Sequence, residues 1–175
     1  MPTLIAPTVR LHKSWVEARD EWEPGAHMDG HGVRETDDLD SDPGFAAWVA
    51  DLLRQEDTAI PPVEGWVHCT YRWIVEDDRY LGSISLRHTL NELLFEMGGH
   101  IGYGLRPSAR GRGLASWALG PTLETARTLG IDPVLITCVP ANLASARVIR
   151  KHGGVYEDTR TTGPHTVQRY WITLG

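Results

Sequence analysis

The chain has 175 residues, of which 41% are hydrophobic, and a formal charge of −6 at pH 7. A chain of this length can bury about 70% of its unfolded surface around one core, so we expect a single domain over residues 1–175. No segment approaches the ~20 apolar residues of a membrane helix, and the acidic balance lacks the basic footprint of nucleic-acid-binding proteins. The composition therefore excludes membrane-spanning and nucleic-acid-binding classes.

The first residues and the cysteines both favour a cytoplasmic protein. The sequence opens without a basic segment followed by a long apolar stretch, so no secretory signal is predicted. Cys69 and Cys138 lie far apart and outside any CxxC spacing. We therefore expect reduced, buried thiols and no metal site.

The two halves of the chain differ in charge. Residues 1–98 carry 19 acidic and 8 basic side chains, whereas residues 99–175 carry 4 and 9. An uneven solvated surface is the simplest explanation. The alternative is that the basic half receives a polyanion while the acidic half attracts a cation.

The first half of the chain is predicted to form two helices, a long loop and a hairpin. Apolar residues recur three to four apart over residues 11–22, which predicts a helix. The polar segment 23–44 is rich in Gly and Asp, shows no period, and is expected to be a loop. A second helix follows Pro43. Residues 66–90 alternate apolar and polar on both sides of EDDR, which is typical of two antiparallel strands joined by a tight turn.

The second half of the chain alternates strands and helices. Strands are predicted at 101–105 and 133–139, with helices over 114–130 and 142–152, and this order implies a parallel crossover. Two further segments, 154–158 and 166–174, are predicted to form a final antiparallel pair. The fold class is therefore α/β with a mixed sheet.

The stretch RPSARGRGLASWAL (residues 106–119) joins the strand at 101–105 to the next helix. A helix start leaves backbone N–H groups unpaired at the positive end of the helix dipole, and Gly111 and Gly113 remove Cβ atoms that would hold an anion away. Arg110 and Arg112 can add charge-assisted hydrogen bonds. The loop predicts a phosphate site, although neither the Walker A motif nor GxGxxG is present. Ordinary turn chemistry is the alternative.

These residues resemble the GCN5-related N-acetyltransferase (GNAT) superfamily, whose acyl-CoA motif is (R/Q)xxGx(G/A). Arg110, Gly113 and Ala115 occupy that motif, and IGYGLRP resembles the family strand that holds pantetheine. NLASARVIRKHGG resembles the second motif of the subgroup related to ribosomal-protein acetyltransferases. The resemblance covers roughly residues 66–158. It implies a GNAT fold, with a mixed central sheet that splays between the fourth and fifth strands and is flanked by helices.

The resemblance implies acetyl-CoA as the cofactor. Gly102 and Gly104 are expected to let it approach the strand, with a bulge or a sharp twist as the alternative reason for glycine. The residues that the resemblance assigns to the cofactor are Tyr103, Leu105, Arg110, Gly111, Arg112, Gly113, Leu114, Ala115, Asn142 and Ser145.

The implied chemistry is direct transfer of acetyl from the thioester to a primary amine. The amine must lose a proton, so a base is needed, and Glu96 and His100 lie beside the predicted strand. For each, a surface charge or a structural histidine is the alternative. Many members carry, at the position of Ile149, a tyrosine that acts as the acid toward the leaving thiolate. The absence of this tyrosine is a departure from the family. Ser145 is the remaining catalytic candidate on that helix, with an exposed helix serine as the alternative.

The acceptor is expected to be a small cationic amine. Residues 17–42 hold ten carboxylates and two arginines, which suits an aminoglycoside-type antibiotic first, and a polyamine or a peptide α-amine next. Four tryptophans could wall the acceptor site, although core packing explains most of them: Trp15, Trp22, Trp66 and Trp73. Two other classes stay open, a non-catalytic acyl-CoA-binding regulator and a phosphate-binding structural module. A homodimer is also left open.

Overall fold

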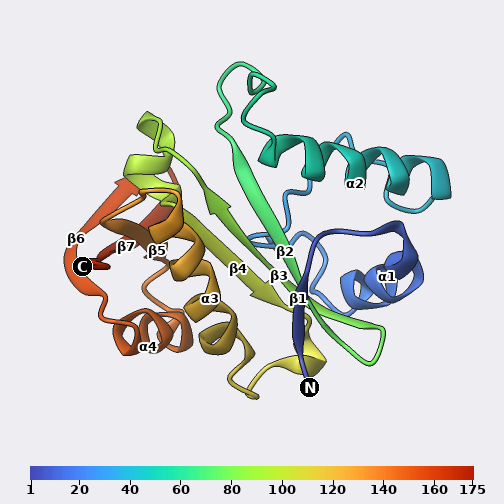
Figure 1. The fold of residues 1–175 in the computed structure, drawn as a ribbon. Helices are drawn as coiled ribbons and strands as arrows, with labels where there is room; N and C mark the ends of the chain where they lie inside the picture. The colour runs from blue at the N-terminus through green and yellow to red at the C-terminus, as the bar shows by residue number, and fades with distance from the viewer.

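The computed structural model describes residues 1–175 and contains one seven-stranded sheet with helices on both faces (Figure 1). The strand order is β1-β2-β3-β4-β5-β7-β6. The strands are β1 (Thr3–Ile5), β2 (Cys69–Glu76), β3 (Arg79–Arg87), β4 (Ile101–Leu105), β5 (Val134–Cys138), β6 (Val155–Thr162) and β7 (His165–Ile172). The helices are α1 (His12–Asp20), α2 (Asp42–Glu56), α3 (Leu114–Thr128) and α4 (Leu143–Lys151).

Two hydrophobic cores lie on opposite faces of the sheet. Helices α1 and α2 cover one face, and α3 and α4 cover the other (Figure 1). The first core is aromatic and is built around Trp15, Phe45, Trp48, Trp73 and Tyr80. The second consists mainly of aliphatic side chains from α3, β3, β4 and β5. This separation leaves β4 in the middle of the sheet with a different layer on each side.

The β2–β3 hairpin turns at Asp77 and Asp78, whose φ angles of 50° and 57° are both left-handed. Two residues in this conformation match the twist of the flanking strands, and aspartate tolerates it. The prediction of a tight turn within EDDR is confirmed. Glu76 and Arg79 pair across it.

The parallel pair β4–β5 is joined at one position only, Ile101 with Ile136. All other neighbouring strands in the sheet are antiparallel. The strands separate after Ile101, and this separation is the splay that the family resemblance implies. The mixed α/β fold is thus confirmed.

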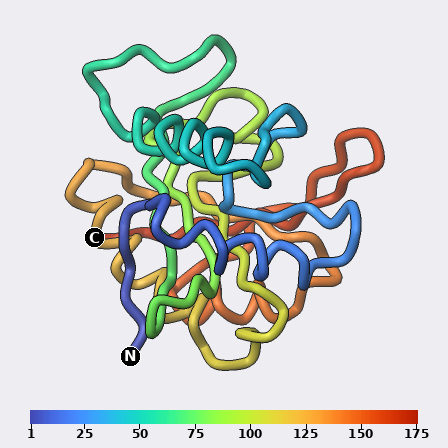
Figure 2. Tube along the Cα trace, turned by 90° about the vertical axis from the view of Figure 1, so that its right-hand side faces the viewer, coloured from blue at the N-terminus to red at the C-terminus, as the bar shows by residue number.

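The predicted helices and strands correspond to those of the structure, with boundaries that differ by a few residues. The loop prediction is also correct, since residues 21–41 contain no helix or strand; this segment passes in front of the sheet in Figure 2. The sequence missed β1, which adds an edge strand beside β2, and a π-helical turn at Leu94–Gly98. Both cysteines are free and buried, as expected. None of the helices is both long and apolar enough to cross a membrane.

Candidate active site

The gap between β4 and β5 exposes backbone groups of β4 that have no partner strand. Arg106 donates its N–H to Leu81 O on the β3 side, and backbone groups alternate along an antiparallel strand. The N–H and C=O groups of Tyr103 and Leu105 therefore point toward β5, with which only Ile101 is paired. An extended amide chain could add to this edge in the manner of a further strand.

His100 closes the narrow end of the gap. Its N–H donates to Leu135 O (2.7 Å), and its ring Nδ1 accepts from Leu135 N (2.9 Å). Burial, together with the charge of Arg87, lowers the pKa of His100 to about 4, so the ring is neutral at pH 7. Because Nδ1 is already an acceptor, the proton of the neutral ring is on Nε2. In this structure His100 holds β4 to β5.

The segment after β4 leaves a row of free N–H groups at the start of α3. Gly113 precedes the helix with φ 76°, no side chain caps it, and Trp117 is the first residue that donates back along the chain, to Gly113 O. The left-handed conformation favours glycine at positions 111 and 113, and a Cβ at either would meet only open space. The backbone from Gly111 to Ser116 thus has free N–H groups that no protein group accepts. Leu114 is buried in the core and Ala115 is half-buried.

The two arginines of this loop have contacts within the protein. Arg110 donates through Nε to Leu105 O (3.3 Å) and its guanidinium lies 4.8 Å from the ring centre of Trp22. Arg112 forms an ion pair with Glu76 (2.7 Å) on the exposed surface. Both remain at the rim of the loop, and their predicted contact with phosphate stays a prediction.

A hydroxyl pair crosses the gap from β4 to α4. Tyr103 Oη and Ser145 Oγ lie 2.7 Å apart, and burial raises the pKa of Tyr103 to about 12. Asn142 caps α4 by accepting from Ser145 N (3.1 Å), which holds Ser145 at the start of the helix. Ser145 is buried, so it is not an exposed helix serine. Ile149 is fully buried in the core.

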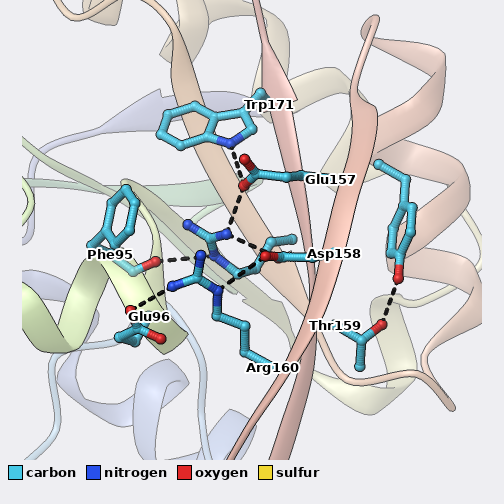
Figure 3. A network of polar contacts seen from close by, with 9 residues as sticks. Phe95, Glu96, Glu157, Asp158, Thr159, Arg160 and Trp171 are labelled. Carbon is cyan, nitrogen blue, oxygen red and sulfur yellow. Dashed lines mark hydrogen bonds and ion pairs between the residues drawn. The ribbon is translucent and has the colours of Figure 1, made fainter.

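Glu96 belongs to a charge network at the β6–β7 end of the sheet (Figure 3). Its carboxylate pairs with Arg160, which also contacts Asp158 (3.1 Å). The fully buried Arg169 donates to Glu157 (2.6 Å) and Asp158 (2.9 Å) in the same network. The π-helical turn that carries Glu96 is thereby fastened to the last hairpin.

A cavity of about 360 Å³ lies on the α1–α2 face of the sheet. It approaches β4 at Gly102, because Ser85 pairs with Gly102 in the sheet and a Cβ on Gly102 would lie 3.2 Å from Gly30 N. The lining residues are His27, Met28, Gly30, Gly32, Val33, Gln55, Gly65, Trp66, Val67, Cys69, Tyr71, Ser85, Arg87, Asn91, Leu93 and Leu94. Neither Glu96 nor His100 is among them.

The glycines of β4 face this side of the sheet, away from α3 and α4. A Cβ on Gly104 would come within 2.9 Å of Asp29 O and 3.1 Å of His31 Cε1. The expectation that Gly102 and Gly104 admit the cofactor is therefore wrong, because the loop at Asp29–His31 packs on them. The side chains of Tyr103 and Leu105 pack against the core on the α3–α4 face of the sheet instead.

The carboxylates of residues 17–42 do not line the cavity. Glu21 forms an ion pair with the buried Arg106 and Asp40 with Arg19, while Asp42 is hydrogen-bonded to His12 and Asp38 to the helix-capping Ser41. Of the four tryptophans considered for the acceptor site, only Trp66 lines the cavity. Trp15 and Trp73 are fully buried in the core.

An open β edge beside a row of free amide groups is an arrangement that suits an extended, anionic ligand between two strands. A family model of the acetyltransferase (GNAT) domain matches residues 26–155, while a search of curated proteins finds no match. The chain therefore belongs to the GNAT family and is an acetyl-CoA-dependent N-acetyltransferase.

Solved structures share the whole fold. An acetyltransferase from Salmonella typhimurium that modifies the N-terminal serine of ribosomal protein L7/L12 is 18% identical, covers 99% of this chain and 95% of its own, and has a TM-score of 0.67. The ribosomal-protein-S5-alanine acetyltransferase from Vibrio fischeri is 17% identical. The match covers 98% of this chain and 91% of that one, with a TM-score of 0.69. The microcin C7 self-immunity acetyltransferase MccE, solved with acetyl-CoA and AMP, is 11% identical. The match covers 99% of this chain and 92% of that one, with a TM-score of 0.68. The subgroup that the sequence resembles is thus among the structural neighbours.

Two polar residues of the cavity were not singled out from the sequence. His27 comes from the long loop and Arg87 from the end of β3, and neither belongs to a motif. In the sequence, segment 23–44 stood out by its length, its polarity and its carboxylates, and not by these two residues. Their place in one cavity depends on how the loop crosses the sheet.

Proposed function

We propose that this enzyme acetylates the α-amine of a peptide or amino acid seated in the cavity between the 27–33 loop and β3. One observation carries the proposal: the cavity reaches the sheet at Gly102, opposite the open β4 edge, and is lined by no carboxylate. A polycation such as an aminoglycoside needs several anionic partners, and the acidic side chains nearby are already paired with protein groups.

The residues present fit the cofactor. Free N–H groups from Gly111 to Ser116 suit a diphosphate, and the unpaired backbone of Tyr103 and Leu105 suits an extended amide chain. Leu105 would bind through its N–H, because its carbonyl already accepts from Arg110. Acetyl-CoA supplies the activated acetyl thioester when bound.

His27 is assigned the role of accepting the proton from the amine. Besides Arg87, the cavity is lined by three titratable side chains, and burial raises the pKa of Cys69 to about 11 and keeps Tyr71 protonated. His27 remains; its Nε2 lies 3.0 Å from Asp29 Oδ1, and this bond raises its pKa. An unprotonated imidazole can take a proton from the amine directly or through one water molecule. Glu96 and His100, the candidates from the sequence, stay untested.

Tyr103 and Ser145 are proposed to supply a proton on the cofactor side. Because burial keeps the phenol protonated, each hydroxyl of the pair carries a proton; one proton lies in the bond between Tyr103 Oη and Ser145 Oγ, and the other is free to be donated. The pair lies beside the free edge of β4, where a departing sulfur atom could receive it. This arrangement would replace the tyrosine that the second motif lacks at Ile149.

The acceptor class can be tested by measuring release of free thiol from acetyl-CoA with a panel of amines. The panel contains short peptides with a free α-amine, the same peptides with a blocked α-amine and a free lysine, spermidine and kanamycin. The proposal predicts the highest kcat/KM for free α-amines, with mass spectrometry placing the acetyl group there. A preference for kanamycin or spermidine that weakens as salt rises would overturn it.

A further inference from the structure

Arg87 lines the cavity with part of its guanidinium unused. It ends β3, and its Nη1 donates to Gly98 O (3.0 Å) and Gly99 O (3.1 Å). No protein group accepts from its Nε or Nη2, and no carboxylate lies within 4.0 Å of it. The contacts to the π-helical turn explain the position of the side chain, while the remaining N–H groups have no internal use.

Arg87 differs from the other arginines of the chain in being both unpaired and withdrawn from solvent. Arginines without a carboxylate partner are Arg87, Arg110, Arg147 and Arg150, and all but Arg87 are exposed. A half-buried guanidinium without a counter-ion is costly, because desolvation weakens its contact with water. An anionic ligand would offset this cost.

The side chains that line the cavity with Arg87 carry no negative charge. The 16 residues that line the cavity include no Asp or Glu. The carboxylates of two neighbouring regions are occupied, since Glu56 pairs with Arg72 (2.7 Å) and Asp51 with Arg34 (3.2 Å). Burial raises the pKa of Cys69, across from Arg87 on β2, while the charge of Arg87 acts in the opposite direction. The cavity is therefore positive where Arg87 enters it.

The distance between Arg87 and Gly102, where the cavity meets β4, suits a small molecule that carries both an amine and a carboxylate. Ser85 stands beside Gly102, and Arg87 follows two residues later on the same face of β3. Two residues of a strand span about 7 Å, and the arginine side chain can shorten that distance. An amine near Gly102 and a carboxylate at Arg87 would then belong to one molecule of amino-acid or dipeptide size.

We propose that Arg87 selects acceptors that carry a carboxylate close to the reactive amine, by binding it through the free Nε and Nη2 donors. This inference rests on the proposed function and narrows it to acidic acceptors. A guanidinium fork matches a carboxylate in two parallel hydrogen bonds, which favours this group over its neutral amide. The carboxylate could be the α-carboxylate of a free amino acid or the side chain of an acidic N-terminal residue.

The experiment compares matched acids and amides as acceptors with acetyl-CoA. Alanine against alaninamide tests the α-carboxylate, and aspartyl-alaninamide against asparaginyl-alaninamide tests the side chain. We expect the acid of at least one pair to have a kcat/KM about tenfold to a hundredfold higher, as for a charge-assisted pair. Arg87→Gln should abolish the preference by slowing the acid while changing the amide little. Arg87→Lys should keep part of it.

Arg10→Gln is the matched control, because Arg10 pairs with Asp78 at the exposed hairpin and lies outside the cavity. Thermal unfolding of each variant shows whether loss of the Gly98 and Gly99 contacts unfolds the protein. Equal kcat/KM for acid and amide in both pairs, or a preference that survives Arg87→Gln, would overturn the inference alone. Absence of transfer to every amine would instead overturn the proposed function, and this inference with it.

Discussion

Tyr103 Oη and Ser145 Oγ lie 2.7 Å apart and connect β4 to α4 across the gap between β4 and β5. The contact joins a strand to a helix that are 42 residues apart in the sequence. It places a protonated hydroxyl beside backbone groups that have no partner strand. The motif position that lacks a tyrosine, Ile149, is meanwhile part of the core.

Tyr103→Phe removes this hydroxyl and keeps the ring that packs in the gap. If the pair supplies a proton during transfer, kcat should fall by about a hundredfold, while KM for the acceptor changes little. Steady-state kinetics with saturating acetyl-CoA measure this. Tyr156→Phe is the control, since Tyr156 donates or accepts only at Thr159 on the exposed β6 strand. Unchanged kcat in Tyr103→Phe would remove the hydroxyl from the mechanism.

Gly113→Asp places a carboxylate and a Cβ at the free N–H groups of α3. We expect the Kd for coenzyme A, measured by calorimetry, to rise at least about tenfold, because a negative charge opposes the diphosphate and a non-glycine residue is strained at φ 76°. Gly163→Asp is the control, because Gly163 is also left-handed (φ 57°) but lies in the β6–β7 turn. An equal effect of both variants would count against a diphosphate at this loop.

His27→Gln should lower kcat/KM by about a hundredfold if His27 takes the proton from the amine. A base must be unprotonated, so the rate of the unmodified enzyme should rise with pH through a pKa above 6.5, the direction in which Asp29 shifts it. Asp29→Asn should move this rise to lower pH.

His165→Gln is the control for His27, because His165 is exposed on the last hairpin. A pH–rate profile that is the same in His27→Gln and the unmodified enzyme would exclude His27 as the base. Glu96 and His100 would then be the remaining candidates for the base.

The ion pair between Glu21 and the buried Arg106 fastens the loop after α1 to the sheet. Arg106 Nε donates to Glu21 (2.9 Å), and this contact, with the N–H of Ser108, lowers the pKa of Glu21 to about 2. The folded-state pKa is below the ordinary 4.5, so this stabilisation is complete above about pH 4.5 and is lost as pH falls toward 2.

Glu21→Gln leaves Arg106 buried without a counter-charge. The free energy of unfolding should fall by about 3 kcal/mol at pH 7, which denaturant titration measures. Glu23→Gln is the neighbouring exposed control and should change it by less than about 0.5 kcal/mol. If both variants are equally stable, the pair contributes only as a surface contact.

Local patterns predicted the fold well because periodicity and turn residues determine the elements. The helix at α2 was predicted from Pro43 and the apolar spacing that follows it, and the hairpin from EDDR, where the turn lies at Asp77 and Asp78. Strand β1 is three residues long and is held by pairing with β2. No local sequence pattern predicts that pairing. The π-helical turn at Leu94–Gly98 likewise depends on distant contacts, such as that of Glu96 with Arg160.

The site was predictable only where its residues are neighbours in the sequence. The glycines before α3 and the Asn142 cap are local features, so their place in the fold could be read from the motif. The cavity unites the 27–33 loop with the ends of β2 and β3, and Arg87 became a candidate only through the absence of carboxylates around it. Charge counting over residues 17–42 could not show which of those side chains form internal ion pairs.

The central claim is that a diphosphate binds the N–H groups from Gly111 to Ser116, with the remainder of the cofactor along the β4 edge. Following backbone amide resonances during addition of coenzyme A tests this directly. The account predicts the largest shifts at residues 111–116, smaller shifts at Tyr103 and Leu105, and little change at the β6–β7 turn. Saturable binding that leaves residues 111–116 unshifted while moving amides elsewhere would contradict it.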